Sequence, residues 1–76
     1  MSAAWIGMQG VESSNLEGVD YDPDTLTLRV MFKGGSTYEY ADVPIEEYEG
    51  LMAAESKGSY FYANIRRGGY EYTKIK

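Results

Sequence analysis

The residues best suited to chemistry lie in one stretch of the chain, from Ser56 to Tyr70. This stretch reads Ser-Lys-Gly-Ser-Tyr-Phe-Tyr-Ala-Asn-Ile-Arg-Arg-Gly-Gly-Tyr and holds three of the seven basic residues and three of the nine glycines. Glycine lets backbone N–H groups approach an anion, and arginine offers a planar fork of donors. The stretch therefore predicts binding of a phosphate-bearing or otherwise anionic ligand.

Within this stretch, the corner Ser56-Lys57-Gly58-Ser59 offers the backbone donors. Helix termini with small residues bind anions through free N–H groups, and Tyr60 follows directly as a further candidate contact. The corner is not a Walker A loop, because the leading glycine and the Gly-Lys-Ser/Thr order are absent. The alternative is an ordinary helix end at Gly58 followed by a helix start capped by Ser59. Both interpretations remain open.

Two further candidate groups are arginine and tyrosine side chains. Arg66 is the preferred ligand of a phosphate or carboxylate, because it lies four residues after Tyr62, and the neighbouring Arg67 is expected to matter less. The alternative is that these cations only offset the helix dipole, which is worth roughly 0.3–1 kcal/mol. Tyr40, with Tyr38, could stack on bases, but both residues fit better as cross-strand core partners whose hydroxyls reach the rim of a pocket.

Catalysis is the least supported class of function. The chain has no cysteine and no histidine, so it lacks a thiolate nucleophile and the commonest general base. Asp20, Asp22 and Asp24 resemble the start of a calcium loop, but Thr25 and Met31 stand where glycine and glutamate are needed. We therefore expect no enzyme, no metal site and no cofactor.

Length and charge restrict the other possibilities. With 76 residues, positions 1–76 form one small domain, and such a domain gains stability from a homodimer or higher homo-oligomer. The net charge of −5 argues against binding of generic duplex DNA, which needs a broad basic surface. No long apolar run or signal peptide is present, so we expect no membrane contact and a cytoplasmic protein.

The elements that must position these residues begin with strands. A strand is expected over residues 15–21, and the strongest one over 26–32, where Leu26, Leu28, Val30 and Phe32 alternate with polar residues or Met31. Residues 36–41 and 70–75 alternate in the same way. A further strand before Asn15 is only weakly indicated, because Gly7 and Gly10 interrupt it.

The register of the hairpin around Gly34-Gly35 follows from cross-strand chemistry. A two-residue loop would place Val30 opposite Glu39. A three-residue loop, with Gly35 in the left-handed conformation, instead joins Val30 to Tyr38, Leu28 to Tyr40 and Arg29 to Glu39. The second arrangement pairs apolar with aromatic groups and cation with anion, so we predict the three-residue loop.

Helices are expected after the hairpin. Asp42 is the predicted cap of the first helix, Pro44 lies in its first turn, and Gly58 should end it near Ser56 or Lys57. Gly50 interrupts this helix, which indicates that another group packs closely there. Ser59 should cap a second helix from Tyr60 to Arg66. The predicted fold is α+β, a small antiparallel sheet of three to four strands with two helices packed on it.

Seven short segments together resemble the KTSC domain family, and they span roughly residues 11 to 75. The segments are Val11-Glu12-Ser13-Ser14-Asn15, Tyr21-Asp22-Pro23, Leu26-x-Leu28-x-Val30-x-Phe32, Tyr38-Glu39-Tyr40, Val43-Pro44, Ser56-Lys57-Gly58-Ser59-Tyr60-Phe61 and Ile65-Arg66. The tyrosine-x-tyrosine pair is the hallmark of the family. The resemblance implies a small stand-alone domain of bacteria and phages that is also appended to the C-terminus of some lysyl-tRNA synthetases. It supports Arg66 as a ligand contact, because Arg66 occupies a family position.

Three functional hypotheses follow. The preferred one is a non-enzymatic module that binds a small phosphate-bearing ligand of the nucleotide type, and the occurrence in phages suggests sequestration of a nucleotide signal. Its expected ligand-binding residues are Ser56, Lys57, Gly58, Ser59, Tyr60, Arg66 and Tyr40. The alternatives are an RNA-binding accessory domain and a protein-interaction module without a small ligand.

Overall fold

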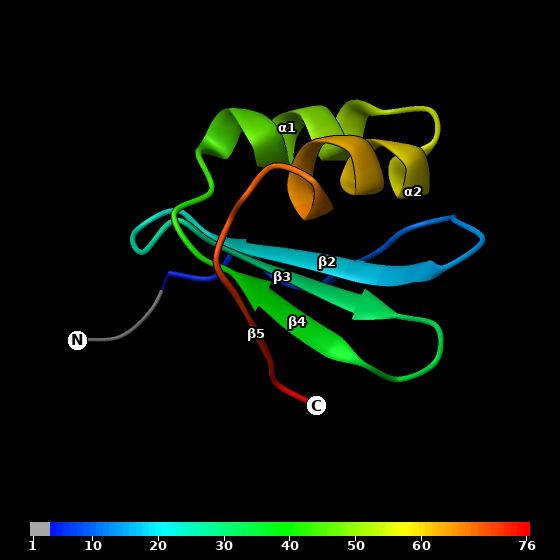
Figure 1. The fold of residues 1–76 in the computed structure, drawn as a ribbon, viewed down its shortest axis with the longest axis horizontal. Helices are drawn as coiled ribbons and strands as arrows, with labels where there is room; N and C mark the ends of the chain where they lie inside the picture. The colour runs from blue at the N-terminus through cyan, green and yellow to red at the C-terminus, as the bar shows by residue number, and fades with distance from the viewer. Residues whose placement is uncertain (1–3) are drawn as a thin grey trace.

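The computed structural model describes residues 4–76, which form one antiparallel sheet with helices packed on one face (Figure 1). Its five strands follow one another in the order β1-β2-β3-β4-β5, as a simple meander. The elements are β1 Gln9–Gly10, β2 Leu16–Asp22, β3 Thr27–Phe32, β4 Thr37–Tyr40, α1 Ile45–Ala53, α2 Lys57–Tyr60, the π-helix η1 Phe61–Arg66 and β5 Tyr72–Lys74. Because α2 runs directly into η1, the helical layer consists of two segments, α1 and α2–η1.

The α+β prediction is confirmed, but the sheet has one strand more than the three to four expected. The additional strand is β1, which pairs Gln9 with Val19 and Gly10 with Gly18. The segment that leads into β1 is held by bonds that sequence patterns do not reveal: the Ile6 N–H donates to the Tyr21 carbonyl, and the Gly7 N–H donates to the Asp20 carboxylate at 2.8 Å. None of the described helices has the length and apolar character needed to cross a membrane.

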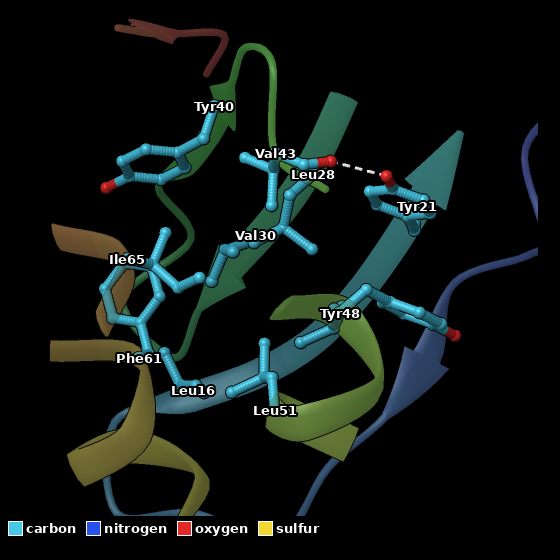
Figure 2. Close-up of a cluster of buried hydrophobic side chains, with 11 residues drawn as sticks. Leu16, Tyr21, Leu28, Val30, Tyr40, Val43, Tyr48, Leu51, Phe61 and Ile65 are labelled. Carbon is cyan, nitrogen blue, oxygen red and sulfur yellow. Dashed lines mark hydrogen bonds between the residues drawn. The ribbon is translucent and has the colours of Figure 1, made fainter. Parts of the chain in front are cut away.

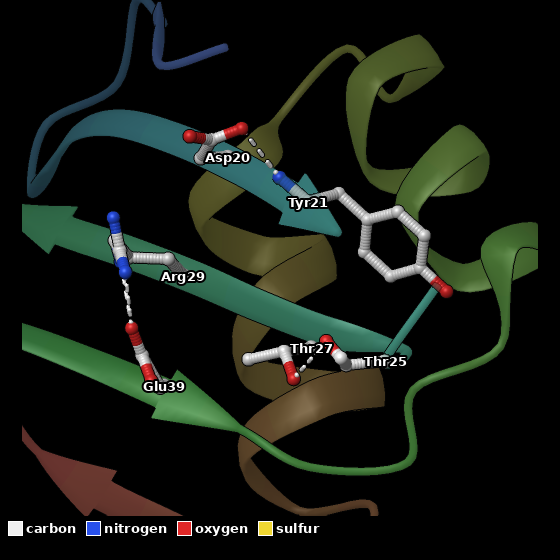
Figure 3. A network of polar contacts seen from close by, with 6 residues as sticks. All are labelled: Asp20, Tyr21, Thr25, Thr27, Arg29 and Glu39. Carbon is white, nitrogen blue, oxygen red and sulfur yellow. Dashed lines mark hydrogen bonds and ion pairs between the residues drawn. The ribbon is translucent and has the colours of Figure 1, made fainter. Parts of the chain in front are cut away.

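The predicted hairpin register is confirmed. Leu28 pairs with Tyr40, Arg29 with Glu39 and Val30 with Tyr38. Gly35 has a φ of +97°, and its N–H donates to the Phe32 carbonyl, which closes the three-residue loop. The ion pair between Arg29 and Glu39 lies on the sheet face away from the helices, as Figure 3 shows. The expected strand start is too early, because Leu26 adopts a φ of +58° and lies outside β3.

The hydrophobic core lies between the sheet and the helices (Figure 2). Leu28, Val30, Tyr48, Leu51 and Phe61 are buried in it, and Phe32 and Met52 are half-buried against them. Tyr21 is fully buried, stacks on Tyr48 with ring centroids 5.0 Å apart, and donates its hydroxyl to the Val43 carbonyl. The remaining buried apolar residues are Leu16, Val19, Tyr40, Val43 and Ile65.

The predicted helix boundaries are wrong around the corner. α1 ends at Ala53. Its N-cap position is held by Pro44 without a side-chain cap, and Asp42, the predicted cap, lies two residues earlier with a φ of +58°. Ser56, not Ser59, caps the second helix, since its Oγ accepts from the Ser59 N–H. Gly58 therefore lies inside α2, and this helix begins three residues earlier than expected. The capping preference of serine was read correctly, but at the wrong one of two serines.

The side chain of Asp22 holds the turn before β3 through its hydrogen bonds. It is buried and accepts N–H bonds from Ala4, Asp24 and Thr25 on one oxygen. Burial acts to raise the pKa of Asp22, but the N–H groups of Asp24, Ala4 and Thr25 together with the Thr25 hydroxyl outweigh it, and the pKa lies below its ordinary value. The ionised carboxylate thus contributes stability above about pH 4, and this contribution is lost as the pH falls through the lowered pKa.

We expect Asp22→Asn to lower the urea midpoint at neutral pH and to reduce the loss of stability on acidification. The exposed Asp24 in the same turn provides the control variant Asp24→Asn, which should retain the wild-type profile. Urea unfolding at neutral pH and near pH 3 measures both effects. Identical acid profiles for the wild type and Asp22→Asn would contradict the assignment.

Candidate functional site

Three hollows lie on the surface of the described residues. The first, which we call the aromatic hollow, measures about 530 Å³ and is lined by Phe32, Ser36, Tyr38, Tyr40, Arg66 and Tyr72. The second, the serine hollow, measures about 500 Å³ and is lined by Glu12, Ser13, Ser14, Asn15, Glu55, Ser56, Lys57, Gly58, Ser59 and Tyr62. The third measures about 400 Å³ and has two carboxylates but no basic side chain in its wall; it is lined by Thr27, Glu39, Tyr40, Ala41, Tyr70, Glu71, Tyr72 and Thr73. Only the first two suit an anion.

The aromatic hollow is built by strand registers. Tyr38 pairs with Val30 in β3 and with Lys74 in β5, and Tyr40 pairs with Tyr72, so these side chains share the helix-facing side of the sheet. The Tyr72 ring lies 5.8 Å from that of Tyr38 and 5.5 Å from that of Tyr40, measured between centroids. Tyr72 is 63% exposed, whereas Tyr40 is only 5% exposed. The hollow thus has a fixed aromatic floor and one accessible aromatic wall.

Arg66 supplies the positive charge of this hollow. It is the last residue of η1 and is exposed. Burial raises the pKa of the Tyr40 hydroxyl, and the charge of Arg66 acts in the opposite direction, which indicates that the guanidinium lies near that hydroxyl. The Arg66 guanidinium also lies 5.9 Å from the Tyr62 ring centroid. An accessible guanidinium beside aromatic rings can bind a phosphate while a flat group stacks on tyrosine.

The serine hollow has fewer free donors than its sequence suggests. The Ser56 Oγ accepts from the Ser59 N–H and bonds to the Ser59 hydroxyl at 2.9 Å, and the Lys57 Nζ donates to the Ala54 carbonyl at 2.9 Å. A Cβ on Gly58 would lie 2.8 Å from the Asn15 Oδ1, so Gly58 packs closely against side chains of the β1–β2 loop. These bonds are those of a helix cap, but the capping residue is Ser56, and Gly58 does not end a helix as the alternative required. Lys57 and Arg66 line different hollows, so the structure does not bring these two predicted site residues together.

Tyr60 lies in neither of these hollows. Its hydroxyl donates to the Glu47 Oε1 at 2.8 Å, and the Tyr70 hydroxyl donates to the Oε2 of the same carboxylate at 3.3 Å. The hydrogen bond to Glu47 raises the pKa of Tyr60. A Cβ on Gly50 would lie 2.2 Å from the Tyr60 hydroxyl, which confirms that a group packs closely on that glycine. The Glu47 carboxylate of α1 therefore joins Tyr60 of α2 to Tyr70 in the segment before β5.

Sequence reasoning missed Phe32, Ser36, Tyr38 and Tyr72 as neighbours of Arg66. The alternation over residues 70–75 indicated a returning strand, but not its partner or register. Because β5 pairs with β4 rather than with another edge, Tyr72 is brought beside Tyr40. Among the described residues, no group of three acidic residues is placed to hold a metal ion.

Comparison with known proteins agrees with this architecture. The sequence model of the KTSC domain family matches residues 12–72. The chain belongs to the KTSC domain family. A crystal structure of a KTSC domain protein from Yersinia pestis superimposes with a TM-score of 0.83 at 35% identity, and the match covers 96% of this chain and 100% of that one.

Two further relatives show the settings in which this domain is found. A protein from Tsukamurella paurometabola is 49% identical over 53 residues, which cover 70% of this chain and 79% of that protein. A lysine–tRNA ligase from Nostoc sp. is 41% identical over 64 residues, which cover 84% of this chain but only 11% of the ligase. The KTSC domain thus forms most of one relative and a small part of the other.

Proposed function

We propose that this KTSC domain is a non-enzymatic module that binds a small phosphate-bearing ligand of the nucleotide type in the aromatic hollow. The observation that carries the proposal is the joint lining of one hollow by Arg66 and the Tyr38, Tyr40 and Tyr72 side chains. The base stacks on the exposed Tyr72 ring, and the phosphate accepts from the Arg66 guanidinium. Base–aromatic stacking is worth about 1–3 kcal/mol, and hydrogen bonds to charged groups about 1.5–3 kcal/mol.

Comparison of two neighbouring arginine variants tests the proposal. We expect Arg66→Ala to weaken nucleotide binding by about tenfold or more, because about 1.4 kcal/mol of lost binding free energy corresponds to a tenfold change. Arg67 is exposed and does not line the hollow, so Arg67→Ala is the matched control with a smaller effect. Both variants should melt close to the wild type, since surface arginines near a helix end contribute little to stability. Calorimetry with mono- and dinucleotides measures the affinities.

The result that would contradict the proposal is absence of heat with every phosphate ligand. Equal weakening in Arg66→Ala and Arg67→Ala would also contradict it, because only a diffuse charge effect treats the two arginines alike. A third variant, Tyr72→Ala, separates stacking from charge. This variant should bind nucleotides more weakly but should bind inorganic pyrophosphate, which has no base, as tightly as the wild type does.

A second candidate function is recognition of single-stranded RNA. The lysine–tRNA ligase relatives favour it, because their name ties the domain to a protein that acts on tRNA. Aromatic side chains that stack unpaired bases are typical of such sites. Tight binding of an RNA oligonucleotide with no binding of mononucleotides would favour this candidate. The net charge of −5 leads us to expect weak binding of duplex DNA in the same assay.

A further inference from the structure

The strand β5 forms an open edge of the sheet. In the order β1-β2-β3-β4-β5 it pairs only with β4, and all three of its residues are exposed (Figure 1). Large apolar side chains are exposed on it and beside it: Tyr72 is 63% and Ile75 50% exposed. An exposed edge of this kind is a template for pairing with another strand.

The backbone groups that face outward on this edge can be identified. The Glu71 carbonyl accepts from Ala41, and the Ile75 N–H donates to the Thr37 carbonyl, so the odd-numbered residues bond toward β4. Because the pattern alternates along a strand, the N–H and C=O groups of Tyr72 and Lys74 point away from β4. Those two residues therefore carry the donors and acceptors that a further strand would use.

We propose that β5 pairs antiparallel with β5 of a second copy of this chain, with Thr73 directly opposite Thr73 of the partner subunit. A two-fold axis perpendicular to the sheet relates the copies and keeps both helical layers on one side. In this register Tyr72 lies opposite Lys74 of the partner subunit, and these two residues exchange both of their N–H···O bonds. The two sheets then form one continuous sheet.

Side-chain complementarity selects this register over its neighbours. A shift of one step in one direction places Lys74 opposite Lys74 of the partner subunit, which sets two cations against each other. A shift in the other direction brings in Tyr70, which lies outside β5 and donates to Glu47 on α1. Centring on Thr73 uses the whole strand and places an ammonium group beside the exposed Tyr72 ring, which is a favourable cation–π arrangement.

This interface rests on the proposed function and deepens it, because it adds a residue to the aromatic hollow. Lys74 is on the same face of the sheet as Tyr38, with which it pairs. In the dimer, Lys74 of the partner subunit approaches the same hollow from the other side of Tyr72. The hollow then has two cations, Arg66 from its own chain and Lys74 of the partner subunit, which suits a ligand with more than one phosphate.

Cysteine cross-linking tests the interface without any ligand. The chain has no cysteine, so each variant carries a single thiol. In the proposed register Thr73 forms a non-hydrogen-bonded pair with its copy, with Cα atoms about 4.5 Å apart, a separation that a disulfide can bridge. Thr73→Cys should therefore give a covalent dimer under mild oxidation at about 0.1 mM protein, a concentration chosen because small interfaces are weak.

Glu71→Cys and Ile75→Cys are the matched controls, because these residues flank β5, continue its bonding to β4 and alternate onto the same face as Thr73. Each would be four residues out of register with its own copy, beyond the roughly 7 Å that a disulfide spans. We expect them to cross-link at least tenfold more slowly than Thr73→Cys. Adding Lys74→Pro to the Thr73→Cys variant removes an outward N–H without touching the β4 ladder, and should abolish the fast cross-link.

Equal, slow cross-linking at all three positions, or a monomer by sedimentation equilibrium at that concentration, would overturn the interface and leave the edge to a peptide of another protein. Fastest cross-linking at position 71 or 75 would overturn this register. Lys74→Ala keeps the backbone donor, so this variant should still form the dimer but should bind a nucleoside triphosphate at least threefold more weakly. Equal affinity of the wild type and Lys74→Ala for the triphosphate would refute the contribution of Lys74 to the hollow. A cross-linked dimer that binds no nucleotide would refute the proposed function and leave the interface standing.

Discussion

Replacing Phe61 with alanine is expected to leave most of the protein unfolded at physiological temperature. Phe61 is 3% exposed, and its ring makes edge-on contacts with Phe32 at 5.5 Å and with Tyr40 at 5.6 Å. Removing a buried phenylalanine costs about 3–5 kcal/mol, because apolar burial is lost and a cavity remains. The core of a domain this small supplies roughly 3–5 kcal/mol in total, so little net stability would be left.

The adjacent Tyr62 provides the control for this prediction. It occupies the same helix but is 54% exposed, and the guanidinium groups of Arg66 and Arg67 lie 5.9 and 6.0 Å from its ring centroid. Tyr62→Ala should cost less than about 1 kcal/mol. Urea unfolding followed by circular dichroism measures both variants. A Phe61→Ala variant that unfolds at the same urea concentration as Tyr62→Ala would show that η1 does not hold the helical layer on the sheet.

The second large effect is expected for Gly68→Ala, at the end of η1. A Cβ at this position would lie 2.4 Å from the Asn64 carbonyl oxygen and 3.0 Å from the Cε2 of Tyr70. The carbonyl oxygen is backbone of the preceding turn, so relief requires a shift of the segment that leads to β5. Overpacking of this kind costs about 1–3 kcal/mol, and each kcal/mol lowers the melting temperature by roughly 4–8 °C in a domain of this size.

Gly34→Ala is the matched control, because a Cβ on Gly34 would meet no atom within 4 Å and its φ is not in the left-handed region. Its melting temperature should stay close to that of the wild type, with a change below about 0.5 kcal/mol. Differential scanning calorimetry compares the two. Equal melting temperatures for both alanine variants would mean that the turn after η1 adjusts without strain.

The sequence by itself determined the features that depend on local chemistry. The alternation of apolar residues in β3, the Gly34-Gly35 turn and the opposite charges of Arg29 and Glu39 were enough to predict the hairpin and its register, which the structure confirms. The same kind of pattern predicted the α+β class. These predictions succeed because turn geometry and cross-strand pairs act between residues that are close in sequence.

Other features depended on contacts between distant segments, and only the tertiary structure decided them. Ser56 and Ser59 have equal capping chemistry, so residue type does not tell which of them starts the helix. In the structure the helix starts at Lys57, after Ser56, and its Gly58 packs closely against Asn15 and Ser13. The segment that leads into the additional strand β1 is held by the N–H groups of Ile6 and Gly7, which donate to Tyr21 and Asp20 of β2. Lys57 lies in a hollow with Ser13 and Asn15, away from Arg66, whereas the pairing of β5 with β4 joins Arg66 to Tyr72. Residue types alone specify neither arrangement.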